Sequence, residues 1–226
     1  LYEFEKAFGK RKTNYDDCYP AGRFTDTKGN SKITRWQEPS RRQVFGESLE
    51  NLKEITEELD NQIIDGIKNS DTYIITLGLS EVFKHKKSGN VVCTHPAYGG
   101  TRSDGIKLVD FWNLTKEDNL KCLQKICSLV KEHKPNANII FTVSPIPLQK
   151  TFTKEKQSIA NEKSKSKLHW AALQVTEEFD NAYYFDSYEH TMSIPPEIRY
   201  LPDGRHVTRQ TVASVVSRFE DQFLTK

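Results

Sequence analysis

Apolar residues recur with a helical period from Ser48 onward, where irregular polar sequence gives way to regular patterning. The apolar positions, three or four residues apart, are Leu49, Leu52, Ile55, Leu59, Ile63 and Ile67. This spacing predicts an amphipathic helix of about 20 residues that buries one face. Ser48 has a side chain suited to an N-cap, so we expect the helix to begin directly after it.

A mostly apolar stretch follows this helix. Residues 72–77 carry β-branched and apolar side chains at both odd and even positions. This pattern is typical of a strand covered on both faces of a sheet. Beyond Gly78, a polar turn at 86–90 leads to a short apolar run at 91–93, which predicts a hairpin or re-entrant loop at the C-terminal end of the strand.

The rest of the chain alternates helices and strands. Thr115 and Asp118 form a capping box ahead of a helix that stops before Pro135. The further predicted elements are a strand at 138–143, a helix at 158–180, a strand at 182–185 and a final helix that begins after Thr208. Such alternation favours parallel strands joined by right-handed crossovers. The sequence therefore predicts an α/β fold with a doubly wound sheet.

The predicted sheet is short of strands. Residues 1–46 lack regular patterning and are expected to form an irregular lead-in to a single domain that spans residues 1–226. Only three strong strands are visible, fewer than the mean of about five to six in a sheet. Either further strands lie within residues 1–46 or the sheet begins upstream of Leu1, and we favour the second interpretation.

Composition and charge argue against several classes of protein. The chain has 33 Lys and Arg against 31 Asp and Glu, and its best basic cluster is only residues 10–12, so we expect no nucleic-acid partner. No apolar run approaches the roughly 18 to 20 residues that span a bilayer. The acidic start does not resemble a signal peptide. Four cysteines without a C-x-x-C spacing favour a reducing, cytoplasmic location.

Neither a cofactor nor a metal is expected. Gly99-Gly100 lacks the lysine and the strand-to-helix setting of a phosphate-binding loop. A zinc site needs ligands at matched spacing, and the histidines do not occur in an H-E-x-x-H pattern.

Asp203 and His206 are the most informative candidates for chemistry. A carboxylate three residues ahead of a histidine can brace one imidazole nitrogen, which leaves the other free to take a proton from a serine hydroxyl. By itself the D-x-x-H spacing is a weak signal, and a surface turn followed by the first residues of a helix is the more common explanation of it. Its place after the last predicted strand of a doubly wound domain favours the functional interpretation.

Further candidates follow from the position of the ligand crevice, which in open α/β sheets lies beyond the carboxyl ends of the strands. The residues expected there as substrate or oxyanion groups are Gly78, Ser80, Glu81, His95 and Ser144. Ordinary loop and strand-end roles are the alternative for each. Ser144 and Ser187 are nucleophile candidates by residue type alone, because neither lies in a G-x-S-x-G elbow.

Several segments resemble, in order, the patterns of the GSCFA family, a branch of the SGNH/GDSL hydrolase-like proteins. They lie at 75–83, 90–95, 141–145, 164–168, 184–189 and 199–206, and the last contains Asp203-x-x-His206. The resemblance covers residues 45–224 and implies a three-layer, doubly wound sheet that is SGNH-hydrolase-like and thus flavodoxin-like. It also implies that Asp203 and His206 belong to a Ser-His-Asp triad.

The chain also departs from the family pattern. It contains no Gly-Ser-Cys-Phe-Ala segment, whose serine occupies the nucleophile position, so the resemblance implies a nucleophile upstream of Leu1. Asp186 replaces a proline, and Val207-Thr208 replaces Pro-Ser. The run at 78–81 lacks the asparagine of an SGNH oxyanion hole, which leaves the oxyanion donors unassigned.

The resemblance implies a hydrolase or acyltransferase that acts on small polar O-acyl esters, with carbohydrate esters as the expected substrates. In this interpretation His206 is the general base and Asp203 orients it. One alternative is a non-catalytic carbohydrate-binding or scaffold protein that retains the fold. A metal-dependent hydrolase that uses the histidines is a second alternative.

Overall fold

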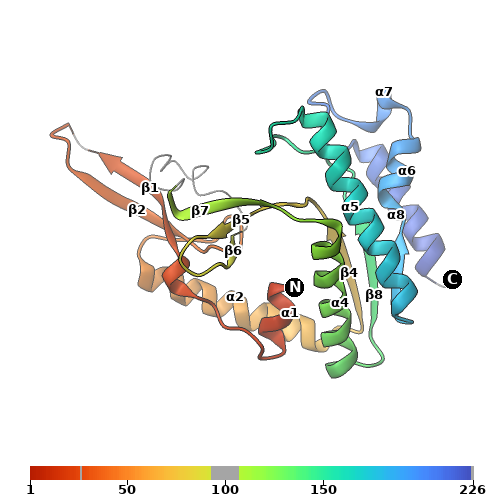
Figure 1. The fold of residues 1–226 in the computed structure, drawn as a ribbon, viewed down its shortest axis with the longest axis horizontal. Helices are drawn as coiled ribbons and strands as arrows, with labels where there is room; N and C mark the ends of the chain where they lie inside the picture. Colours follow the sequence, from red (N-terminus) through yellow and green to blue (C-terminus); the bar gives the residue numbers. More distant parts are fainter. Residues whose placement is uncertain (26, 93–106, 225–226) are drawn as a thin grey trace. The chain divides into compact units, whose positions relative to one another are not determined.

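The computed structural model describes residues 1–25, 27–92 and 107–224, and the chain separates into two compact units (Figure 1). Unit 1 comprises residues 1–70 and 81–113, and unit 2 comprises residues 71–80 and 114–226. The segment 81–113 is therefore an excursion from unit 2, which the chain leaves after Ser80 and re-enters at Leu114. That one domain spans residues 1–226 stays a prediction.

Unit 1 is built on two small antiparallel sheets, ordered β1-β2-β3 and β6-β5-β7. Its elements are α1 (Tyr2–Ala7), η1 (Tyr15–Asp17), β1 (Tyr19–Thr25), β2 (Ser31–Gln37), β3 (Phe45–Gly46), α2 (Leu49–Asn69), β5 (Glu81–His85), β6 (Val91–Val92) and β7 (Val109–Asn113). The pairing of β5 with β6 confirms the predicted hairpin, and β7 adds a strand that the sequence analysis missed.

The prediction that residues 1–46 are irregular was wrong, because they contain α1, η1 and three strands. The strands escaped notice since β1 carries Pro20 and Gly22 and its register with β2 shifts at both. Such breaks disrupt the alternation that identifies a strand. These strands pair with one another and not with the parallel sheet, so they do not supply its expected additional strands.

Buried and partly buried charges hold the N-terminal segment of unit 1 to α2. Arg41, which follows β2, donates to both carboxylate oxygens of Glu3 at 2.7 and 2.6 Å and lies 2.6 Å from Asp60 of α2. Lys6 of α1 also pairs with Asp60. Charge-assisted, bidentate contacts of this kind stabilise the packing of these segments and also fix the relative orientation of the two side chains.

Unit 2 contains a parallel sheet of order β4-β8-β9, flanked by helices, which confirms the α/β prediction. Its elements are β4 (Thr72–Leu77), α4 (Lys116–His133), β8 (Asn138–Val143), α5 (Gln157–Glu178), β9 (Ala182–Phe185), α6 (Ser187–Ser193), α7 (Pro196–Arg199) and α8 (Arg209–Phe223). Helices α4 and α5 pack side by side, and α5 contacts β8 and β9 (Figure 1).

The predicted helix starts are confirmed by their caps. Ser48 accepts a hydrogen bond from the backbone amide of Asn51 at 3.1 Å, and Thr115 and Asp118 form the reciprocal capping box of α4. Thr208 likewise caps α8. The short helices α6 and α7 were not predicted.

The core of unit 2 surrounds the central strand β8, whose side chains from Ile139 to Val143 are all buried. The edge strand β4 behaves differently: Tyr73 is buried, whereas Ile74 is 57% exposed. The prediction that residues 72–77 are covered on both faces was therefore wrong. An edge position with one open face explains the alternation in exposure along β4.

No helix within the described ranges is long and apolar enough to cross a membrane.

Candidate functional site

The loop that precedes α8 brings Asp203 and His206 together. The carboxylate Oδ2 of Asp203 pairs with Nδ1 of His206, and Oδ1 accepts hydrogen bonds from the backbone amides of Arg205 and His206 at 2.9 and 3.0 Å. Gly204 adopts a φ of +65°, a conformation that glycine adopts without strain, and this lets the chain turn around the carboxylate.

This arrangement fixes the charge of Asp203 and the orientation of the imidazole. The hydrogen bonds from His206 and from the two backbone amides lower the pKa of Asp203 to about 2. Because Asp203 engages Nδ1, the Nε2 atom of His206 remains available. Both side chains are about half exposed, so a substrate or a second protein segment can reach Nε2 from solvent.

The Asp203–His206 loop is anchored on the segment that follows β8. Nε of Arg205 donates to the carbonyl of Pro147 at 3.2 Å, and the hydroxyl of Tyr200 donates to the carbonyl of Pro145 at 3.1 Å. The loop closes on itself through a hydrogen bond from the amide of Leu201 to the carbonyl of His206 at 2.7 Å. The pair is thus tied to the carboxyl end of the sheet, where α/β proteins bind ligands.

The turn after β4 lies at the same end of the sheet as Ser144. The amide of Ser144 donates to the carbonyl of Leu77 at 2.9 Å, which places Gly78 and Ser144 side by side. Ser80 is buried, and its amide donates to the hydroxyl of Ser164 at 2.8 Å. That amide cannot donate to an oxyanion at the same time.

The two serine candidates make local hydrogen bonds. Ser144 is half-buried, and its hydroxyl accepts from the amide of Ile146 at 3.2 Å. Ser187 is buried; its hydroxyl lies 2.5 Å from that of Thr142 and donates to the carbonyl of Val143 at 3.1 Å. Neither hydroxyl is hydrogen-bonded to His206.

The other two predicted residues lie outside the described part of unit 2. Glu81 begins β5 in unit 1, where it pairs with Asn113 of β7. His95 lies outside the described residues. In the described part of the chain, no group of three or more His, Cys, Asp or Glu side chains is arranged to hold a metal ion.

Some contacts at the site were not predictable from spacing. Tyr200 and Arg205 reach backbone carbonyls 55 and 58 residues away, and Lys165 donates to the carbonyl of Gly78 across 87 residues. The resemblance to the family did point to 164–168 and 199–206, but it assigned no contact to these side chains.

The fold and the loop define an α/β protein with a parallel sheet and a hydrogen-bonded Asp–His pair tied to the sheet's carboxyl end. The GSCFA family model matches residues 2–219, and the chain belongs to the GSCFA family. A search of curated proteins found no match, and neither did a search of solved structures.

Proposed function

We propose that this protein is an SGNH-like hydrolase or acyltransferase in which His206 is the general base and Asp203 orients it. The observation that carries the proposal is the Asp203–His206 hydrogen bond, on an exposed loop tied to the carboxyl end of a parallel sheet. Membership of the GSCFA family supports it.

In the proposed mechanism the nucleophile is a serine outside these 226 residues. Nε2 of His206 takes the proton as the serine oxygen bonds to the acyl carbonyl carbon. When the tetrahedral intermediate collapses, the carbon–oxygen bond to the alcohol breaks and the imidazolium returns the proton to the leaving oxygen. Water, or an acceptor alcohol, then attacks the acyl-serine by the same route and regenerates both groups.

Stabilisation of the oxyanion is assigned to the turn that contains Gly78. The backbone amide of Ser80 already donates to the hydroxyl of Ser164. We therefore propose the backbone amides of Gly78 and Leu79 as the donors to the oxyanion in this turn. Preorganised amides at such a position stabilise the developing charge. Ser144, at the end of the neighbouring strand, is proposed to contact the substrate. Roles for Glu81, which begins β5 of unit 1, and for His95, which lies outside the described residues, stay predictions.

The proposed substrates are small polar O-acyl esters, with esters of carbohydrates as the preferred class. This choice rests on analogy with SGNH-type hydrolases, and a shared fold does not by itself determine the substrate. No cofactor is part of the proposal.

The test uses the natural protein and a fluorophosphonate probe, which reacts with a serine activated by histidine. We expect labelling of one serine, with labelling and ester turnover abolished by His206→Ala. His133→Ala, in α4, is the control and should leave both unchanged. Retention of a tenth or more of kcat by His206→Ala would exclude His206 as the base. A labelled serine within residues 1–226 would overturn the assignment of the nucleophile.

A non-catalytic role in carbohydrate binding is the second candidate. It is favoured by one observation: no serine within the described ranges is hydrogen-bonded to His206. Saturable binding of sugars without turnover of p-nitrophenyl acetate would support this role. Steady turnover that depends on His206 would exclude it.

A further inference from the structure

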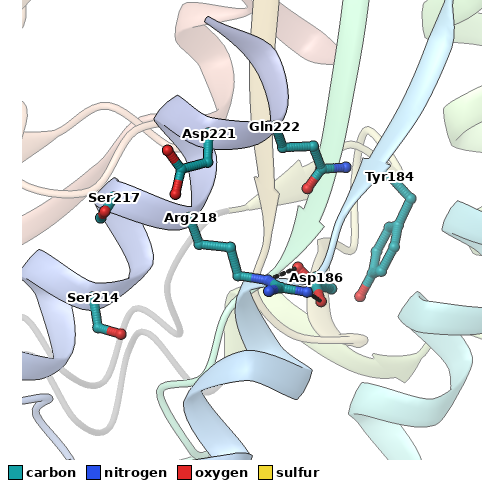
Figure 2. A pocket seen from close by; sticks show the side chains of 7 residues that line it. All are labelled: Tyr184, Asp186, Ser214, Ser217, Arg218, Asp221 and Gln222. Carbon is teal, nitrogen blue, oxygen red and sulfur yellow. Dashed lines mark hydrogen bonds and ion pairs between the residues drawn. The ribbon is translucent and has the colours of Figure 1, made fainter.

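A pocket at the carboxyl end of β9 has no part in the proposed mechanism. It has a volume of about 690 Å³ and is lined by residues of β9, the segment after it and α8 (Figure 2). This volume is within the usual range for ligand sites of about 300 to 1,000 Å³. Strand β9 is last in the order of the sheet, so the pocket lies at a sheet edge.

The lining contains no aliphatic side chain. Six polar residues and one tyrosine form it: Asp186, Ser214, Ser217, Arg218, Asp221, Gln222 and Tyr184. Pockets for apolar ligands are lined mainly by hydrophobic and aromatic groups. A polar ligand therefore fits this lining better than an apolar one.

Asp186 and Arg218 form the fixed part of the pocket. Nε and Nη2 of Arg218 donate to the two carboxylate oxygens of Asp186 at 2.8 and 2.6 Å, and this interaction lowers the pKa of Asp186. Figure 2 shows Arg218 reaching from α8 to Asp186, with Tyr184 and Gln222 beside the pair. The opposite charges compensate each other, while the guanidinium keeps unused N–H donors and the carboxylate keeps unused lone pairs.

Other side chains along the same face of α8 are available to a ligand. The side chains of Ser217, Asp221 and Gln222 form no hydrogen bond with any described residue. These three residues lie on the same face of α8 as Arg218. Ser214 differs, because its hydroxyl lies 2.8 Å from Nε2 of His190. Asp221 adds a negative charge near the compensated pair, so the lining does not favour an anionic ligand.

Tyr184 is the one aromatic residue among the seven that line the pocket. Its hydroxyl donates to the carboxylate of Glu189, with both oxygens at 3.0 Å, and its ring lies 5.2 Å from that of His169. The ring is therefore held in place by groups outside the pocket. A fixed aromatic ring among hydroxyl, amide and carboxylate groups matches a ligand with both C–H faces and many hydroxyls.

We propose that the pocket formed by Tyr184, Asp186 and the polar face of α8 is a binding site for a neutral saccharide. The proposal does not require that the protein cleave an ester. It does not involve Asp203 or His206.

The test is saturation-transfer difference NMR on the chain with glucose, galactose, N-acetylglucosamine and maltose as probes. We expect at least one sugar to bind with a saturable, millimolar dissociation constant. The double variant Asp221→Asn, Gln222→Ala replaces a carboxylate acceptor by an amide and removes a second amide, both at exposed positions. It should weaken the binding of that sugar about fivefold or more. Glu220→Gln, Gln210→Ala changes matched exposed positions of α8 outside the pocket and should bind as the unmodified chain does.

The proposal is overturned if none of the four sugars saturates, or if the pocket variant and its control bind equally well. His206→Ala separates this proposal from the proposed function, because it should abolish ester turnover and leave sugar binding unchanged. Loss of sugar binding in His206→Ala, with normal binding in the pocket variant, would place the sugar at the Asp203–His206 loop and overturn the assignment to this pocket.

Discussion

Nζ of Lys165, in α5, donates to the carbonyl oxygen of Gly78 at 2.9 Å, directly after β4. Lys165 is only 2% exposed, and this carbonyl is its sole hydrogen-bond partner among the residues that the structure describes. The hydroxyl of the preceding residue, Ser164, accepts a hydrogen bond from the backbone amide of Ser80. Two successive residues of α5 thus hold a carbonyl and an amide of the same turn, at the carboxyl end of the sheet.

The burial of Lys165 predicts a specific dependence of stability on pH. Burial lowers the pKa of Lys165 from 10.5 to about 8, because the charged ammonium is poorly solvated. Between these two values the unfolded chain binds more protons than the folded chain, so the free energy of unfolding rises with pH. We expect a gain of at most about 3 kcal/mol from this group.

The measurement is urea denaturation of the chain and of Lys165→Met at pH values from 7 to 10.5. Lys165→Met lacks the titrating group, so the unmodified chain should gain stability relative to it as the pH rises. A difference between the two that does not change with pH would contradict the lowered pKa.

Ser164 is predicted to stabilise unit 2 through its hydroxyl. Ser164→Ala removes the acceptor of the Ser80 amide in a buried position, and we expect the free energy of unfolding to fall by about 1 to 3 kcal/mol. Ser166→Ala, an exposed position on the same helix, is the control and should change stability by less than about 0.5 kcal/mol. Equal effects of the two substitutions would show that the Ser164–Ser80 hydrogen bond contributes nothing measurable.

The hydrogen bond from His206 lowers the pKa of Asp203, so we expect this carboxyl group to titrate at an unusually low pH. Its pKa of about 2 means that the carboxylate stays charged well below the ordinary value of 3.8. The stabilisation from this group is present above pH 3.8 and is lost as the pH falls through about 2. Carbon-13 NMR of the Asp203 carboxyl measures this midpoint directly.

In His206→Ala the midpoint of Asp203 should move up toward 3.8, because the largest stabilising hydrogen bond is removed. Arg209→Ala, at an exposed position of α8, keeps the backbone amides, His206 and the Arg205 anchor, so it should titrate as the unmodified chain does. An unchanged midpoint in His206→Ala would show that the imidazole does not stabilise the carboxylate.

Local patterns in the sequence predicted much of unit 2 and helix α2 of unit 1. The caps at Ser48, Thr115 and Thr208 lie within a few residues of the groups they bond, so they could be recognised from spacing. The Asp203–His206 pair was predictable for the same reason, since its partners are separated by three positions.

Contacts between distant segments could not be predicted in this way. The Asp186–Arg218 pair spans 32 residues, and nothing in either local sequence identifies the partner. The exposure of Ile74 depends on β4 being an edge strand, which is a property of the sheet and not of residues 72–77. The hairpin of β1 and β2 was missed because its register shifts obscure the alternation.

The open edge of β4 predicts self-association of the chain. Strand β4 pairs only with β8 in the described residues, and Ile74, which lies in one row with Ile140 and Tyr183, is 57% exposed. An unpaired edge beside an exposed apolar side chain is a template for pairing with another chain. We expect sedimentation velocity to show association that increases with concentration.

A lysine at this position should suppress that association, because a charge on an edge strand opposes pairing with a second strand. Ile74→Lys should therefore shift the sedimentation profile toward the monomer. Ile159→Lys introduces the same charge at another exposed isoleucine, on α5 and away from the sheet edge, and should associate as the unmodified chain does. A chain that remains monomeric at all concentrations and melts cooperatively would contradict the prediction, and equal effects of the two lysines would assign the association to net charge and not to β4.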